Sequence, residues 1–218
     1  MALIERPPRV TSAALRLLIY DQTCRGNQGF LGLTHSWMVG AAACRSLGRF
    51  DRSRAVTGWE EALRWLAEVE PSRPIAEIQF WGHGQWGEAL IGGEPLDERI
   101  LAPSHRLHSM LRTIRGRLAG HEALWWFRCC EIFGADRGQG FAEAWCSFLG
   151  CCAAGHTFLI GPWQSGLHRL RPGETPRWSR REGLAEGDDP SSPRKALWSR
   201  PGRPHTITCF HTRVPARY

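Results

Sequence analysis

Short apolar runs alternate along this chain with segments whose apolar residues recur every three or four positions. Largely apolar runs are typical of strands buried on both faces, and they occur at residues 15–20, 75–81, 122–127 and 156–160. Helical periodicity predicts amphipathic helices at residues 36–47, 57–70, 105–118 and 141–149. Residues 50–56 are expected to form an edge strand, and residues 205–211 a last strand. This order predicts an α/β fold with a mainly parallel sheet flanked by helices.

Local signals refine these elements. Thr34 is expected to cap the first helix, and Thr57 with Glu60 fits the capping box that opens the second. Turn glycines in residues 85–96 predict a small hairpin over the mouth of the sheet. The glycines of residues 134–140 predict a loop.

The length of the chain fits a single domain. Its 218 residues, of which 42% are hydrophobic, can bury one good core. Proline- and glycine-rich turns appear beyond Gly161. We therefore expect one domain over residues 1–218, with a core at about 15–161 and an irregular C-terminal segment at 162–218.

The amino-acid composition limits which binding partners and which cellular compartment we expect for the protein. The net charge of +7 comes almost wholly from arginine, because Lys195 is the only lysine. The arginines are scattered and often lie near acidic residues, which argues against nucleic-acid binding. The chain shows neither an apolar signal segment nor a run of membrane-spanning length, so we expect a cytoplasmic protein without membrane contact. Its eight cysteines are expected to be mostly free thiols.

Two of the apolar runs stop abruptly at a reactive residue. His83 stands between Gly82 and Gly84 after one run, and Cys130 follows the other. Neighbouring parallel strands end at the same edge of a sheet, so they would bring His83 and Cys130 together. An imidazole beside a thiol can take its proton and later return it to a leaving amine. The backbone N–H groups of Gly84 and Cys130 are candidate oxyanion donors.

Two other interpretations use the same residues. A zinc cluster of Cys129, Cys130, Cys151, Cys152 and His83 is disfavoured, because adjacent cysteines on a strand do not easily chelate one ion and no Cys-x-x-Cys pair exists. We therefore expect neither a metal nor another cofactor. A non-catalytic interaction module is the third interpretation, since the eleven tryptophans offer adhesive surface.

At these residues the chain resembles the caspase-like cysteine peptidases, the group of caspases, metacaspases, legumain and gingipains, together with a bacterial family of caspase-like domains. The family pattern is an apolar block followed by His-Gly, then an apolar block followed by a small residue and the catalytic Cys. His83 and Gly84 match the first half, and Cys129 and Cys130 match the second. The resemblance covers roughly residues 15–161. It implies a caspase-like sandwich and a cysteine endopeptidase that acts through an acyl-enzyme, with His83 as base and acid and Cys130 as nucleophile.

The resemblance also implies residues that bind the substrate, a protein or peptide. Arg128 holds the place of a specificity-pocket residue, and Asp21 follows the first strand where another usually lies. A free Arg128 would favour an acidic residue before the scissile bond, and an Arg128 neutralised by Asp21 a polar one. Trp163 lies in a loop that lines the groove in these peptidases. Trp81 and Trp86 are also placed near the cleft.

The chain departs from the family at two points. Glu131 follows the nucleophile where Asn, Arg or His often stands, and residues 134–140 show no recognisable activation loop. A regulatory protein partner is compatible with this pattern. The alternative function is therefore a catalytically silent caspase-like interaction module.

Overall fold

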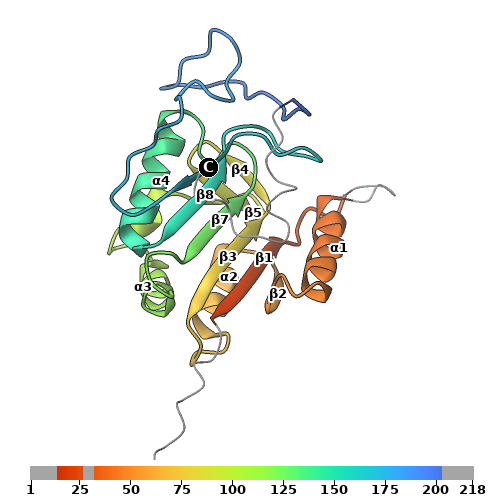
Figure 1. Ribbon diagram of the computed structural model, residues 1–218, viewed down its shortest axis with the longest axis vertical. Helices are drawn as coiled ribbons and strands as arrows, with labels where there is room; N and C mark the ends of the chain where they lie inside the picture. Colours follow the sequence, from red (N-terminus) through yellow and green to blue (C-terminus); the bar gives the residue numbers. More distant parts are fainter. Residues whose placement is uncertain (1–13, 27–31, 203–218) are drawn as a thin grey trace, which may run out of the picture.

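A six-stranded sheet forms the centre of the protein in the computed structural model, which describes residues 14–26 and 32–202 (Figure 1). The strand order is β2-β1-β3-β7-β8-β9, with all neighbours parallel except the antiparallel pair β8 and β9. The strands are β1 (Leu15–Asp21), β2 (Arg52–Val56), β3 (Ile75–Trp81), β7 (Leu124–Arg128), β8 (Cys152–His156) and β9 (Leu167–Leu170). The predicted α/β fold with a mainly parallel sheet is confirmed.

Four α-helices cover the two faces of this sheet unequally (Figure 1). They are α1 (Leu33–Ser46), α2 (Trp59–Glu68), α3 (His108–Arg117) and α4 (Ala135–Leu149), with a short 3₁₀ helix at Glu98–Leu101. Side chains from α2, α3 and α4 share one core cluster, whereas α1 packs with Leu18 and Trp81 in another. Because successive strand residues point to opposite faces, α1 is the one helix of the described residues that lies against the second face.

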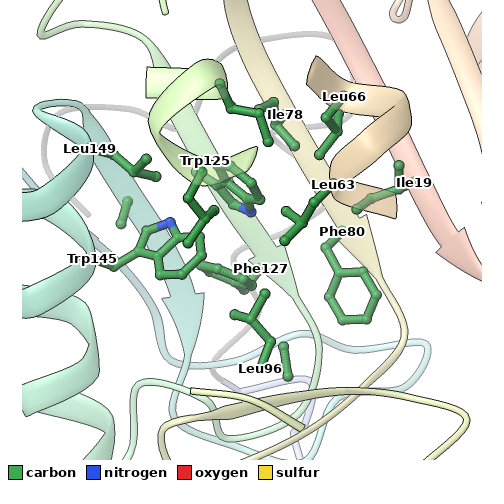
Figure 2. Close-up of a cluster of buried hydrophobic side chains, with 14 of the residues drawn as sticks. Ile19, Leu63, Leu66, Ile78, Phe80, Leu96, Trp125, Phe127, Trp145 and Leu149 are labelled. Carbon is green, nitrogen blue, oxygen red and sulfur yellow. The ribbon is translucent and has the colours of Figure 1, made fainter. Parts of the chain in front are cut away.

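Aromatic side chains fill the larger core (Figure 2). Trp125 of β7 meets Trp145 of α4 with ring centroids 5.0 Å apart, and Trp59 of α2 meets Phe80 of β3 at 4.8 Å. These rings lie at angles to one another, as aromatic pairs prefer. Most of the tryptophans that the sequence leaves without a role therefore hold the sheet to its helices.

Two predicted helix caps are wrong. Gly32, not Thr34, precedes α1, and the Thr34 hydroxyl inside the helix donates to the backbone carbonyl of Asp21 at 3.1 Å. At α2, Glu61 replaces the predicted Glu60, since its carboxylate accepts from the N–H and the hydroxyl of Thr57, both at 3.0 Å. Thr34 therefore lies inside α1, and Gly58 stands between Thr57 and the first residue of α2.

Two predicted boundaries are also wrong. The glycines of residues 134–140 belong mostly to the first turns of α4, where a side chain on Gly138 would strike the backbone of Ile132 and Phe133. The strand predicted to begin after Gly155 is β8, which begins at Cys152. Gly155 lies inside β8, where the ring of Phe133 and the side chain of Ile132 fill the space that a Cβ would take.

A second, antiparallel sheet follows β3. It consists of β4 (His83–Gln85), β5 (Glu88–Ile91) and β6 (Glu94–Leu96), so the predicted hairpin is confirmed and gains a third strand. The C-terminal segment, blue in Figure 1, runs over one end of the main sheet after β9. The last strand predicted at residues 205–211 lies outside the described residues.

Candidate functional site

The register between β3 and β7 brings the two halves of the candidate dyad to one edge. Trp81 at the end of β3 pairs with Arg128 at the end of β7. His83 and Cys130 each follow their member of this pair by two residues. They therefore leave the sheet at equivalent positions on adjacent parallel strands, as the sequence predicts.

Gly84 fixes how closely these two segments approach. A Cβ on Gly84 would lie 2.5 Å from the carbonyl oxygen of Cys130 and 2.6 Å from the Sγ of Cys129. Only a residue without a side chain fits this contact. The backbone of β4 therefore lies directly on the segment that carries the two cysteines.

The two adjacent cysteines differ in environment. Cys129 is fully buried in the main core, where burial, then Cys130 and Glu131, raise the pKa of its thiol well above the usual range. Cys130 is partly exposed, and its Sγ accepts the N–H of Ile160 at 3.4 Å. Burial raises the pKa of the Cys130 thiol, the Ile160 bond lowers it, and Glu131 raises it. Cys130 is thus the thiol of the pair that a reagent can reach.

His83 is exposed at the start of β4. Its ring meets the ring of Trp37 of α1 edge to face, with centroids 5.8 Å apart. Within the described residues no hydrogen bond joins the imidazole to the Cys130 thiol. The structure thus brings His83 and Cys130 to one edge of the sheet without a hydrogen bond between their side chains.

Arg128 places a positive charge two residues before Cys130. Its Nε donates to Oε1 of Gln164 at 2.8 Å. Its guanidinium lies over the rings of Trp81 and Trp126, at 5.0 and 5.5 Å from their centroids. Cation–π contacts of this kind hold a cation without removing its charge.

Asp21 is 1% exposed, and its carboxylate organises loops at the end of β1. It accepts the N–H groups of Thr23 at 2.7 Å and of Gly92 at 3.3 Å, and the Cys24 thiol at 3.5 Å. These hydrogen bonds tie the loop after β1 to the hairpin of the small sheet. The contacts described for Asp21 and for Arg128 thus lead to different partners.

Trp163, the third substrate-binding candidate, is partly exposed in the loop between β8 and β9. Its carbonyl accepts the N–H of Gly161 at 2.9 Å. The next residue, Gln164, bonds to Arg128. The loop therefore brings Trp163 close to the edge where Arg128 and Cys130 end their strand.

Glu131 is a residue of the site whose role the sequence does not reveal. It is 7% exposed, has a φ of 39°, and its Oε2 has no hydrogen-bond partner in the described structure. Burial raises the pKa of its carboxyl to about 7. The sequence signal is only its place after Cys130, because burial arises from the packing of distant segments.

A ladder of buried, hydrogen-bonded polar side chains, formed by Arg49, Glu77, Gln79 and Trp81, lies next to the site. Arg49 donates to both oxygens of Glu77 at 2.6 and 2.5 Å, Gln79 donates to Glu77 at 2.7 Å, and Trp81 donates to Gln79 at 2.9 Å. The three strand residues alternate along β3, so they share the face that carries α1. The ladder ends at the indole on which Arg128 lies.

Residues 14–26 and 32–202 contain no group of three or more His, Cys, Asp or Glu side chains that could hold a metal ion, and the seven cysteines there are free. No helix in these ranges is long and apolar enough to cross a membrane. Neither a scan against models of known protein families nor a search of curated proteins found a match.

Proposed function

We propose that the protein is a cysteine endopeptidase with a caspase-like sandwich fold. The observation that supports this proposal most is the contact of Gly84 with Cys130 beyond two paired parallel strands. An exposed histidine and a partly exposed thiol share one sheet edge there, where open α/β sheets usually carry their ligands and chemistry. The buried Cys129 fits the small residue that precedes the nucleophile.

The proposed reaction is an acyl transfer in two steps. His83 takes the proton of the Cys130 thiol, and the thiolate attacks the carbonyl carbon of a peptide bond. The N–H groups of Gly84 and Cys130 stabilise the oxyanion, and His83 protonates the departing amine. Water, deprotonated by His83, then hydrolyses the thioester. The thiol must turn from the Ile160 N–H toward the substrate before attack.

Arg128 gives this site a proposed specificity for an acidic residue before the scissile bond. The guanidinium is fixed by Gln164 and two indoles close to Cys130. A fixed fork of donors suits a carboxylate. Asp21 would shape the pocket through the loops that it holds, and Trp163 would line the groove.

Selective alkylation tests the dyad. The purified protein is treated with a limiting amount of iodoacetamide, and the labelling rate of each cysteine is followed by peptide mass spectrometry. Cys130 is expected to react fastest, and His83→Ala is expected to remove this selectivity. The partly exposed Cys24 is the internal reference, because it is accessible but lies beside Asp21 instead of a histidine.

Cleavage of a mixed peptide library tests the reaction. Loss of cleavage in Cys130→Ala but not in Cys129→Ala would identify the nucleophile. Uniformly slow labelling together with no cleavage would instead favour a catalytically silent interaction module. Two observations favour this second function: burial raises the pKa of the Cys130 thiol, and no hydrogen bond within the described residues joins this thiol to His83.

A further inference from the structure

The imidazole of His83 needs a fixed orientation if it is to take a proton from Cys130, because proton transfer depends on where the ring nitrogen points. The backbone of His83 is held in β4, where it pairs with Leu90 of β5. The side chain is exposed, and within residues 14–26 and 32–202 no hydrogen bond or ion pair reaches the imidazole. In this part of the chain, the orientation of the ring therefore depends on packing.

Trp37 of α1 supplies this packing. Its ring meets the His83 ring at 76°, with the centroids 5.8 Å apart, which is an edge-to-face arrangement that aromatic rings prefer. The indole itself is partly buried and packs on the core cluster that contains Leu18 and Trp81. An indole fixed on one side by this cluster can limit the rotation of the imidazole on its other side.

Two contacts hold α1, and with it Trp37, against the sheet. One turn before Trp37, the Thr34 hydroxyl donates to the backbone carbonyl of Asp21 at 3.1 Å. One turn after it, Gly40 faces the indole of Trp81, and a Cβ on Gly40 would lie 3.0 Å from the nearest ring carbon. Trp37 thus lies between two points at which α1 contacts β1 and β3.

The strand order separates Trp37 from Cys130. His83 follows β3, which lies between β1 and β7 in the sheet. Trp37 comes from the β1 side, because α1 begins beside the end of β1, and Cys130 follows β7 (Figure 1). A ring on the β1 side therefore limits rotation of the imidazole away from the thiol.

We propose that Trp37 is the positioning residue of the dyad, whose indole holds the imidazole of His83 toward the Cys130 thiol. A carboxylate or a backbone carbonyl often fills this role for a functional histidine. The inference rests on the proposed peptidase function, because it gives the orientation of His83 a part in proton transfer. Since Trp37 acts through His83, its replacement should slow proton transfer and leave substrate binding unchanged.

The first measurement is nuclear magnetic resonance of protein labelled with [13Cε1]histidine, which needs no activity. The His83 signal is assigned by its loss in His83→Ala, and an Overhauser effect between the imidazole and indole protons is expected. The order parameter of the His83 Cε1–H bond should fall in Trp37→Leu, which keeps an apolar side chain without a ring. Trp37→Phe keeps an aromatic ring and should keep the order. No Overhauser effect in the wild type, or equal order in Trp37→Leu, would overturn the positioning role.

The second measurement is turnover of the peptide that the wild type cleaves best. Trp37→Leu is expected to lower kcat by about two- to tenfold with KM unchanged, and Trp37→Phe is expected to restore most of the rate. Val39→Ala is the matched control on the same helix, because Val39 is 66% exposed, and it should match the wild type. A higher KM with unchanged kcat would overturn the role, since it would place Trp37 against the substrate.

Iodoacetamide labelling separates this inference from the proposed function. Equal labelling of Cys130 in the wild type and in His83→Ala would overturn the peptidase proposal, whereas the ordering of the imidazole by Trp37 would stand. Faster labelling of Cys130 in the wild type, together with an imidazole equally ordered in Trp37→Leu, would overturn only the role of Trp37.

Discussion

Gly84 and Cys130 are in direct backbone contact, although they belong to different strand ends. The 2.5 Å between a Cβ on Gly84 and the carbonyl oxygen of Cys130 leaves no room for any side chain. The second close atom, the Sγ of Cys129 at 2.6 Å, is buried and cannot move aside easily. The position of the His83 segment relative to the thiols therefore depends on this glycine.

Gly84→Ala should accordingly destabilise the protein and disturb the site. Overpacking of a tight contact typically costs about 1–3 kcal/mol, measurable as a lower urea midpoint. Gly116→Ala in α3 is the control, because that glycine has open space around it and alanine favours a helix by about 1 kcal/mol. Equal stability of Gly84→Ala and the wild type would show that the two segments separate freely.

The burial of the Glu131 carboxyl predicts that the free energy of unfolding depends on pH. Its pKa is raised from an ordinary 4.5 to about 7 by burial, so the folded protein keeps a proton that the unfolded chain releases. Wild-type stability should therefore fall as pH rises from about 4.5 to 7, and then level off. Glu131→Gln removes this loss, and should be more stable than the wild type by up to about 3 kcal/mol at pH 8 but not at pH 4.5.

Urea unfolding of both proteins between pH 4.5 and 8.5 measures this difference. Glu143→Gln on the exposed side of α4 serves as the control, and its stability relative to the wild type should stay constant across the same range. A Glu131→Gln effect that is independent of pH would contradict the assignment of a buried carboxyl.

The same variant should make the candidate nucleophile more reactive. The charge on Glu131 raises the pKa of the Cys130 thiol, after the larger effect of burial. Removing that charge lowers the thiol pKa, so more thiolate is present at pH 8. Iodoacetamide should then label Cys130 faster in Glu131→Gln than in the wild type at pH 8. An unchanged rate would place the carboxyl away from the sulfur.

The main strands and the convergence of their ends could be predicted from the sequence. The run before Arg128 is apolar on both faces, residues 75–81 become so toward their end, and β3 has the predicted bounds. Parallel neighbours must end at one edge, so His83 and Cys130 were expected there. The close contact of their two segments at Gly84 could not be predicted, because the local sequence does not determine how these segments align with each other.

The remaining features depend on distant segments. The Ile160 N–H reaches Cys130 only because residues 156–160 extend β8 beside the cysteine segment. β9 and the isolated bridges at Ala196 and Trp198 come from a stretch rich in proline and glycine whose sequence shows no strong periodicity. Likewise, Thr34 and the glycines of α4 give strong local signals that tertiary packing overrides.

Arg128 predicts the specificity of the proposed peptidase. Arg128→Gln keeps a planar donor beside Gln164 but removes the charge, so cleavage after acidic residues should fall by about tenfold or more through a higher KM. Cleavage after neutral residues should change little. Profiling a peptide library with Arg128→Gln and the surface control Arg112→Gln checks this, and a wild-type preference for Arg or Lys would exclude the proposed role of Arg128.

The buried Arg49–Glu77 pair predicts that replacing Arg49 destabilises the protein far more than replacing an arginine of an exposed pair. Both side chains of this pair are almost fully buried, whereas Arg64 and Glu60 form an exposed pair on α2. Arg49→Met leaves the Glu77 carboxylate buried with only Gln79 as donor, which should cost about 3–5 kcal/mol. Arg64→Met should cost less than about 1 kcal/mol.

Urea unfolding compares the two variants. The double variant Arg49→Met/Glu77→Leu should recover most of the lost stability, because no charge is then left unpaired. A similar small cost in both single variants would mean that water reaches Glu77, and that the ladder under Trp81 does not hold Arg128 in place.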